Sequence, residues 1–510
     1  MNAISLLHRL TSVTRVSALT DAIARSFTTG EPERPALSSM RALGRRQLSG
    51  VEVLAQSVAT TAPAVSMVIL PLTMLTHDRL VSGIVTILVA TIAVTLIAFC
   101  VSQFTRRMAA AGGLHSFAFR GSGSRAALTA AVAMLVKYVG SAVMTLYHGG
   151  QAVIALCGLA GFSPPAPPVY LALAVGILCC LVRGVRFAAV TILAVEMCSL
   201  AFIVALMLFG DNASALVLVP PASGHGTLAL VLTALFALAG FESAAFFGPE
   251  ARRPLVTVTR TVLLTPLICG SLFLFAGWAA WTGRSDTLVD AYLHGTATGV
   301  DPVIVVALNV GLSCSWLASS MASSNAASRL VYSLGVEGAL PRWCGRVHAS
   351  FRTPDAALAL VVGVVVLGAG TFAVLGTGVV FGDLRLVVRG AVIVAYVVVA
   401  IASVRFLSRI GEQTPRVLAA STLGSVAGTS VLGYLVYVNV IDASYVVPVA
   451  VVAVLSSGLV WRSWLRGRHP DALLRMGAFD NAESADVLPG AGVFAADASG
   501  RTVLVGRDAR

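Results

Sequence analysis

The sequence predicts an all-α polytopic membrane protein of about twelve transmembrane helices, arranged as two inverted five-helix halves and two additional helices. First, 57% of its 510 residues are hydrophobic and only 11% are charged, whereas ordinary soluble proteins carry about 25% charged residues. Second, apolar runs of about 20 residues recur along the chain, bounded by charged residues or by glycine and proline. Third, two of these runs contain helix-breaking residues at mid-span.

The apolar runs lie between a polar N-terminal segment, 1–49, and a polar C-terminal segment, 466–510, and we expect both segments to be tails outside the membrane. The predicted spans are 51–76, 79–102, 127–158, 169–183, 188–210, 228–254, 259–282, 302–333, 356–376, 387–406, 416–439 and 444–464. The membrane domain therefore covers 50–465. It divides into a first repeat at 50–210, a second repeat at 226–406 and two extra helices at 416–465.

The distribution of arginine predicts the orientation of these spans. The two tails and every second loop hold nearly all the arginines. The opposite loops hold only about four of them, namely Arg79, Arg284, Arg385 and Arg389. Because positively charged loops stay on the cytoplasmic side, both termini are predicted to be cytoplasmic in a multi-pass protein of the cytoplasmic membrane. The net charge of +12 is spread between spans and not gathered on one face, which argues against a nucleic-acid partner.

The predicted halves share a pattern. Each contains five spans, so the second half enters the membrane from the side opposite to the first. The first span of each half is interrupted and the third span of each is unusually long. This pattern is typical of inverted-repeat transporters, whose substrate lies between the two interrupted helices.

The two interruptions have clear local causes. The first span contains Ala59-Thr60-Thr61-Ala62 followed by Pro63, and a proline inside a helix removes a hydrogen-bond donor and bends the chain. In the sixth span, Gly240 weakens the helix and Glu242 places a carboxyl group at membrane depth. A charge at that depth normally faces a cavity or a partner.

Four stretches then resemble members of the amino acid–polyamine–organocation (APC) superfamily, which has the LeuT-like fold with broken helices 1 and 6. They are AQSVATTAPAVSM at 55–67, GGLH at 112–115, GFESA at 240–244 with PEARRP at 249–254, and SNAASRLVYSLG at 324–335 followed by EGALP at 337–341. They occur in the family's order and on the corresponding spans. The chain is therefore identified as similar to an amino acid permease over roughly 50–465.

Three positions depart from the family's usual pattern. Ala59–Ala62 stands where a glycine-rich triplet is common, and His115 stands where tyrosine is common. Val336-Glu337 replaces an expected Arg-Asp pair. We therefore expect an altered charge pair on the cytoplasmic side.

The resemblance implies a substrate site between the two breaks. The backbone amides around Ala59, Thr60, Thr61 and Ala62 would bind a carboxylate, and the carbonyls around Phe236, Ala237, Ala239 and Gly240 would bind an amine. Phe241 would be an aromatic lid over the substrate, with Phe236 as the weaker alternative. The structural alternatives are an ordinary proline-kinked span and a core aromatic side chain.

Ion or proton coupling has several candidates. Glu242 is a possible proton carrier or a structural carboxyl group. Lys137 and Glu196 are proton or cation-site candidates, or a structural pair with each other, and Lys137 could instead reach the interface. Ser323 and Ser324 belong to a polar stripe of the eighth span that could bind sodium, although we favour packing of small residues between helices.

The predicted function is secondary active transport of an amino acid or related amine by alternating access, coupled to protons rather than to sodium. The alternatives are a polyamine or amine carrier, an amino acid exchanger and a non-transporting sensor. An enzyme is not predicted, because the sequence shows no nucleophile–base set, no metal-ligand cluster and no phosphate loop. No cofactor or metal is expected, and the partners are a small-molecule substrate and the lipid bilayer.

Overall fold

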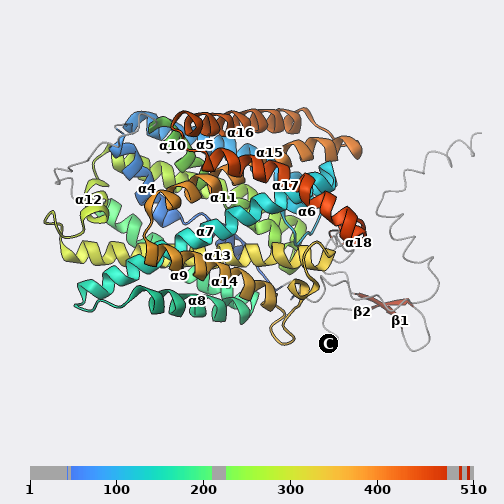
Figure 1. Ribbon diagram of the computed structural model, residues 1–510, viewed down its shortest axis with the longest axis horizontal. Helices are drawn as coiled ribbons and strands as arrows, with labels where there is room; N and C mark the ends of the chain where they lie inside the picture. Colours follow the sequence, from blue (N-terminus) through green and yellow to red (C-terminus); the bar gives the residue numbers. More distant parts are fainter. Residues whose placement is uncertain are drawn as a thin grey trace, which may run out of the picture. The chain divides into compact units, whose positions relative to one another are not determined.

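The computed structural model describes residues 43, 47–77, 79–209, 226–478, 480, 493–496 and 502–505. Within these residues, eleven helices are long and apolar enough to cross a membrane, and the 17-residue helix Ala166–Val182 is a shorter apolar helix between two of them. The predicted all-α polytopic fold is confirmed (Figure 1). Most of the two predicted tails lies outside the described residues.

The first half contains the following helices: α3 (Gly50–Thr60), α4 (Pro63–Thr76), α5 (Leu80–Thr105), α7 (Ser124–Leu159), α8 (Ala166–Val182) and α9 (Val185–Phe209). The second half contains α10 (Gly226–Ala237), the 3₁₀ helix η2 (Phe241–Glu250), α11 (Pro254–Trp281), α13 (Pro302–Glu337), α14 (Asp355–Leu375) and α15 (Gly378–Arg409). The two extra helices are α16 (Pro415–Ile441) and α17 (Val446–Arg468). Both predicted interruptions are present, between α3 and α4 and between α10 and η2.

One predicted boundary is wrong by more than two turns. The tenth span was expected to begin at 387, but α15 begins at Gly378. Its first turns include Asp383 and Arg385, and such charges make a segment look like a loop when only hydropathy is considered. The consequence is that Arg385 lies on a membrane helix and not in a loop, and that Arg389 lies well inside this helix and not near its start.

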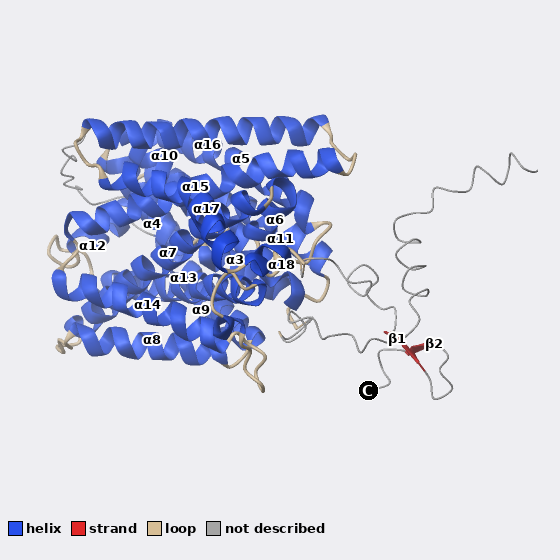
Figure 2. Cartoon of the chain, turned by 45° about the vertical axis from the view of Figure 1, so that its right-hand side comes forward, coloured by secondary structure: helices blue, strands red, loops and turns tan. Residues whose placement is uncertain are grey.

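Short elements occur in the polar segments as well. They are α6 (Leu114–Ser122), α12 (Asp286–His294), η3 (Arg342–Gly345), α18 (Pro470–Arg475), β1 (Val493–Ala496) and β2 (Thr502–Val505). The strands β1 and β2 are antiparallel, with Val493 opposite Val505. They are the only strands among the described residues, and Figure 2 shows them in red.

The two long helices α7 and α13 pack along each other in the interior of the bundle. Each is the third membrane-spanning helix of its half, and both are mostly buried. By contrast, α16 lies at the edge of the bundle in Figures 1 and 2. Its exposed apolar side chains include Leu423 and Val426, which in a membrane would face lipid.

The two unusual residues His115 and Glu337 turn out to be partners. His115 Nε2 lies 2.9 Å from Glu337 Oε2, and both side chains are buried. Where the family pattern led us to expect an altered charge pair, the structure has a histidine–glutamate pair between α6 and the end of α13.

The segment after α18 docks on this pair. The Gly477 amide donates to Glu337 Oε1 at 3.1 Å, and Arg120 donates to the Gly477 carbonyl at 3.0 Å. Ser116 Oγ donates to Asp480 Oδ1 at 2.9 Å. The C-terminal segment was predicted only as a tail outside the membrane, but buried polar contacts hold this part of it against the bundle.

We predict that this docking weakens as the pH rises. Burial and the charge of Glu337 raise the pKa of Asp480 to about 6. Burial, the largest single influence, lowers the pKa of His115, but the charge of Glu337 and the hydrogen bonds to Glu337 and to the Ala127 carbonyl together raise that pKa. Asp480 therefore binds its proton more tightly when the segment is docked, so docking is strongest at low pH and weakens as the pH rises through about 6.

Hydrogen exchange of 470–478 is the measurement. After correction for intrinsic exchange, the open population should rise on the order of 100-fold between pH 4 and pH 7, because a shift of about two pKa units changes an equilibrium by that factor. Asp480→Asn should remove most of this dependence. A pH-independent open population in the unmodified protein would contradict the prediction.

Candidate functional site

The first interruption is built around a strained residue. Helix α3 ends at Thr60 and α4 begins at Pro63. Between them, Ala62 has φ 45° and ψ 62°, in the left-handed region, which costs an L-residue roughly 1–2 kcal/mol. Such strain persists only where the surroundings impose it, and it gathers at functional sites.

The backbone amides at this break are partly occupied. The Thr61 amide donates to the Val58 carbonyl and the Ala62 amide donates to the Ala59 carbonyl, both at 3.0 Å. Pro63 has no amide hydrogen. Two of the amides that were predicted to bind a carboxylate at 59–62 are therefore already used in hydrogen bonds within the chain.

The second interruption abuts the first. Helix α10 ends at Ala237 and η2 starts at Phe241. A Cβ atom added to Gly240 would lie 2.8 Å from Thr61 Cγ2 and 3.0 Å from the Thr61 amide nitrogen. Only glycine permits this approach of the two breaks.

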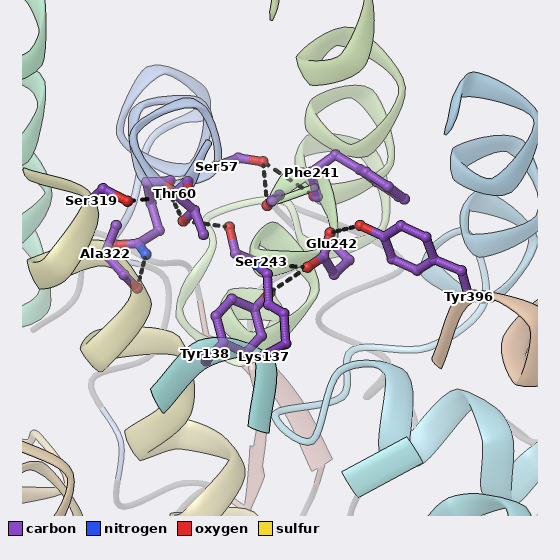
Figure 3. Close-up of polar contacts among 12 residues, drawn as sticks. Ser57, Thr60, Lys137, Tyr138, Phe241, Glu242, Ser243, Ser319, Ala322 and Tyr396 are labelled. Carbon is purple, nitrogen blue, oxygen red and sulfur yellow. Dashed lines mark hydrogen bonds and ion pairs between the residues drawn. The ribbon is translucent and has the colours of Figure 1, made fainter. Parts of the chain in front are cut away.

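Side chains of α3 tie the two breaks together, as Figure 3 shows. Ser57 Oγ donates to the Phe241 carbonyl at 3.1 Å, and Thr60 Oγ1 donates to Ser243 Oγ at 3.2 Å. Ser319 Oγ on α13 donates to the Thr60 carbonyl at 3.3 Å. The two broken helices and α13 thus form one hydrogen-bonded unit.

A cavity of about 470 Å³ lies beside this unit. Six predicted substrate residues line it: Thr60, Thr61, Ala62, Phe236, Ala237 and Ala239. Three do not line it: Ala59, Gly240 and Phe241. Its size suits a small-molecule ligand.

The two candidate aromatic lids differ in position. Phe236 lines the cavity. Phe241 is buried behind it, where its ring packs 5.3 Å from the ring of Tyr396. Of these two candidates, Phe236 is therefore the one that can touch a substrate in this conformation, and the lid role of Phe241 stays a prediction.

Sequence reasoning missed several cavity residues. They come from α7, α12, α13 and α15, and include His148, Tyr292, Trp316, Arg385 and Arg389. The two arginines were counted as loop charges. The signal that could have identified them is that Arg389 is followed by an uninterrupted apolar run, and charges inside a span are functional candidates.

Glu242 lies in a closed polar cluster (Figure 3). Lys137 Nζ lies 3.1 Å from Oε1, Tyr138 Oη donates to Oε1 at 2.9 Å, and Tyr396 Oη donates to Oε2 at 2.7 Å. All four side chains are buried. A carboxylate with an ammonium partner and two hydroxyl donors is stabilised in its charged form.

This cluster corrects two expectations about Lys137. The alternative that Lys137 pairs with Glu196 is wrong, because its partner is Glu242. Lys137 also does not extend to the interface, because its side chain is buried in the bundle.

Glu196 has a different environment. It is buried in α9, and Ser315 Oγ donates to its Oε1 at 3.0 Å. Its Oε2 has no hydrogen-bond partner, and no cation pairs with it, among the described residues. Glu196 is thus a buried carboxyl group whose charge nothing in the described structure balances.

Ser323 and Ser324 are buried in α13, and their hydroxyl groups have no hydrogen-bond partner among the described residues. The described part of the chain contains no group of three or more His, Cys, Asp or Glu side chains that could hold a metal ion. A sodium site at these serines stays a prediction, as does the packing alternative.

At the end of η2 that lies away from the break, a buried ion pair joins η2 to α13. Arg329 donates to both oxygens of Glu250, at 2.6 and 2.9 Å, and its guanidinium lies 4.1 Å from the ring centre of Phe247. The Leu48 amide donates to the Glu250 carbonyl at 3.0 Å. A bidentate buried pair of this kind is rigid, so it locks η2 to α13.

Comparisons with known proteins point to transporters. The chain is 27% identical over 301 residues to an uncharacterized transporter of Rhizobium meliloti (strain 1021), covering 56% of this chain and 64% of that protein. It is 28% identical over 162 residues to the low-affinity putrescine importer PlaP of Escherichia coli (strain K12), covering 29% of this chain and 34% of the importer. No family model matches the chain. This multi-pass membrane protein is therefore similar, over part of the length of these relatives, to transporters.

Proposed function

We propose that the protein is a secondary transporter of the APC type, which moves an amino acid or a related small molecule across the cytoplasmic membrane by alternating access. The observation that carries the proposal is the pair of interrupted helices that meet at Thr61 and Gly240 beside a cavity of about 470 Å³. Irregular backbone at membrane depth is tolerated where it lines such a cavity.

The closed and open ends of the site support alternating access. The cavity includes His77 and Tyr292, which the predicted topology places at the outer side. The Arg329–Glu250 pair closes the opposite side. We therefore assign the structure to an outward-facing state, with both termini cytoplasmic. Inward opening requires this pair to separate while the cavity closes around the substrate.

Glu196 is our candidate for the proton carrier. The sequence favoured Glu242, but that carboxylate already has Lys137 as its partner. Glu196 has no such partner among the described residues, and an unpaired charge in an apolar interior is costly, so its uncharged form is favoured. Its bond to Ser315 connects it to α13, one of the helices that line the cavity.

Glu196→Gln is expected to abolish substrate accumulation driven by a proton gradient, while exchange of substrate across the membrane continues. Glutamine keeps the hydrogen bond to Ser315 but cannot release a proton. Uptake and counterflow into proteoliposomes are the measurements. Glu412→Gln, at an exposed acid, is the matched control. Accumulation at the unmodified level in Glu196→Gln would eliminate Glu196 as the carrier.

An amine or polyamine carrier is the second candidate, and the similarity to a putrescine importer favours it. The experiment that tests both is uptake of a mixed pool of amino acids and amines into proteoliposomes, with and without an inward proton gradient. Accumulation of an amino acid supports the first proposal. Entry of amines alone supports the second. If nothing enters under proton, sodium or exchange conditions, transport itself is rejected in favour of a sensor.

A further inference from the structure

We propose that the cavity is an anion site, in which Arg389 and Arg385 bind a carboxylate, so that the substrate is a small acidic compound such as a dicarboxylic amino acid and not a diamine. This inference rests on the proposed transport function, since it names the substrate class of the same site.

Arg389 is the first observation. Its side chain is 8% exposed and lines the cavity. Its Nε has no hydrogen-bond partner, and no acid pairs with it, among the described residues. Its guanidinium carbon lies 5.7 Å from the ring centre of Phe236, another cavity residue. A buried, unpaired cation is costly, and a bound anion would remove that cost.

Arg385 is the second observation. It lies one turn before Arg389 on α15 and lines the same cavity. Like charges at this spacing repel each other on a helix. A carboxylate between them would attract both guanidinium groups and so offset this repulsion. Arginine is also suited to bind carboxylates with two parallel hydrogen bonds.

The third observation is the absence of compensating acids. None of the described residues that line the cavity is Asp or Glu. Glu242, the nearest acid in sequence to the second break, is neutralised by Lys137. Asp290 on α12 is engaged by His294 and Thr298 at 2.8 Å each. Two arginines and no acid leave the lining of the described cavity with a formal charge of +2 when its histidines are neutral, which repels a diamine with two positive charges.

The rest of the lining fits an amino group as well as a carboxylate. Ala237 and Ala239 line the cavity where α10 ends, and the C-terminal end of a helix carries partial negative charge. A dicarboxylic amino acid can therefore place its ammonium at this end and a carboxylate at Arg389. The carboxylate-binding group is then an arginine pair, in addition to the partly occupied amides of 59–62.

The test is ligand binding by the purified full-length protein in detergent, in a chloride-poor buffer, with glutamate, aspartate, succinate, alanine and putrescine as probes. We expect the acidic probes to bind and putrescine not to bind. Arg389→Gln should weaken binding of the acidic probes by roughly tenfold or more, because it removes a charge-assisted pair. Arg389→Lys should weaken it less, since the charge remains. Arg79→Gln, at an exposed arginine outside the cavity, should bind as the unmodified protein does.

Thermal unfolding without ligand controls for misfolding. Arg389→Gln should unfold at the same temperature as the unmodified protein or at a higher one, because it removes an unpaired buried cation. Binding of putrescine or alanine in preference to the acidic probes, or acid binding that Arg389→Gln leaves unchanged, overturns the anion site but not transport. Acid binding that depends on Arg389, without uptake, supports the anion site and overturns transport. If no probe binds, the anion site is rejected.

Discussion

Lys137→Met is expected to destabilise the protein by roughly 3–5 kcal/mol, the usual cost of removing one partner of a buried ion pair. Without Lys137, Glu242 would keep its bonds to Tyr138 and Tyr396 but lose the only cation near its carboxylate among the described residues. Glu242→Gln should be destabilising for the opposite reason, because it leaves the ammonium of Lys137 unpaired in the bundle.

The double variant Lys137→Met with Glu242→Gln should recover most of the lost stability, because neither charge then remains without a partner. Thermal unfolding in detergent of the unmodified protein, both single variants and the double variant completes the cycle. If the effects of the single variants simply add in the double variant, the pair is not coupled and this interpretation of the cluster is wrong.

Gly240→Ala is expected to impair transport by separating the two broken helices. The added Cβ would lie 2.8 Å from Thr61 Cγ2 and 3.0 Å from the Thr61 amide nitrogen, which belongs to the backbone and cannot rotate away. Overpacking of this kind destabilises a fold by roughly 1–3 kcal/mol, and the part of that strain which displaces Thr61 from the cavity should raise the substrate concentration needed for half-maximal uptake.

The matched control is Gly363→Ala on α14, where an added Cβ meets no atom within 4 Å. Initial uptake rates as a function of substrate concentration compare the two variants. Gly363→Ala should transport as the unmodified protein does. Unaltered uptake by Gly240→Ala would show that close contact between Thr61 and Gly240 is not needed for the site.

Local chemistry in the sequence was enough to predict the membrane-spanning helices and the two interruptions. Hydropathy reports whether a segment can lie in lipid, and it identified most helix boundaries to within a few residues. Pro63 and Gly240 act on the backbone at their own positions, so the breaks beside them were visible without any knowledge of neighbouring helices. Glu242 was also visible as a charge at membrane depth.

The partners of the buried charges came only from tertiary structure. Glu242 was recognised, but the only partner considered for Lys137 was Glu196, because nothing local tells which of two distant acids a lysine will meet. The pairing of His115 with Glu337 was likewise unpredictable as a specific contact, although both positions departed from the family pattern.

The two cavity arginines show most clearly the difference between what the sequence predicts and what only the tertiary structure reveals. The sequence contained Arg385 and Arg389, and their charges suggested a loop. The packing of α15 against α7 and α10 instead places them in the membrane bundle, at the lining of the cavity. Hydropathy and helix breakers act within a few residues of the chain, so the sequence alone was sufficient for the spans and the breaks. Charge pairing and cavity lining depend on which helices become neighbours, and only the folded bundle decides that.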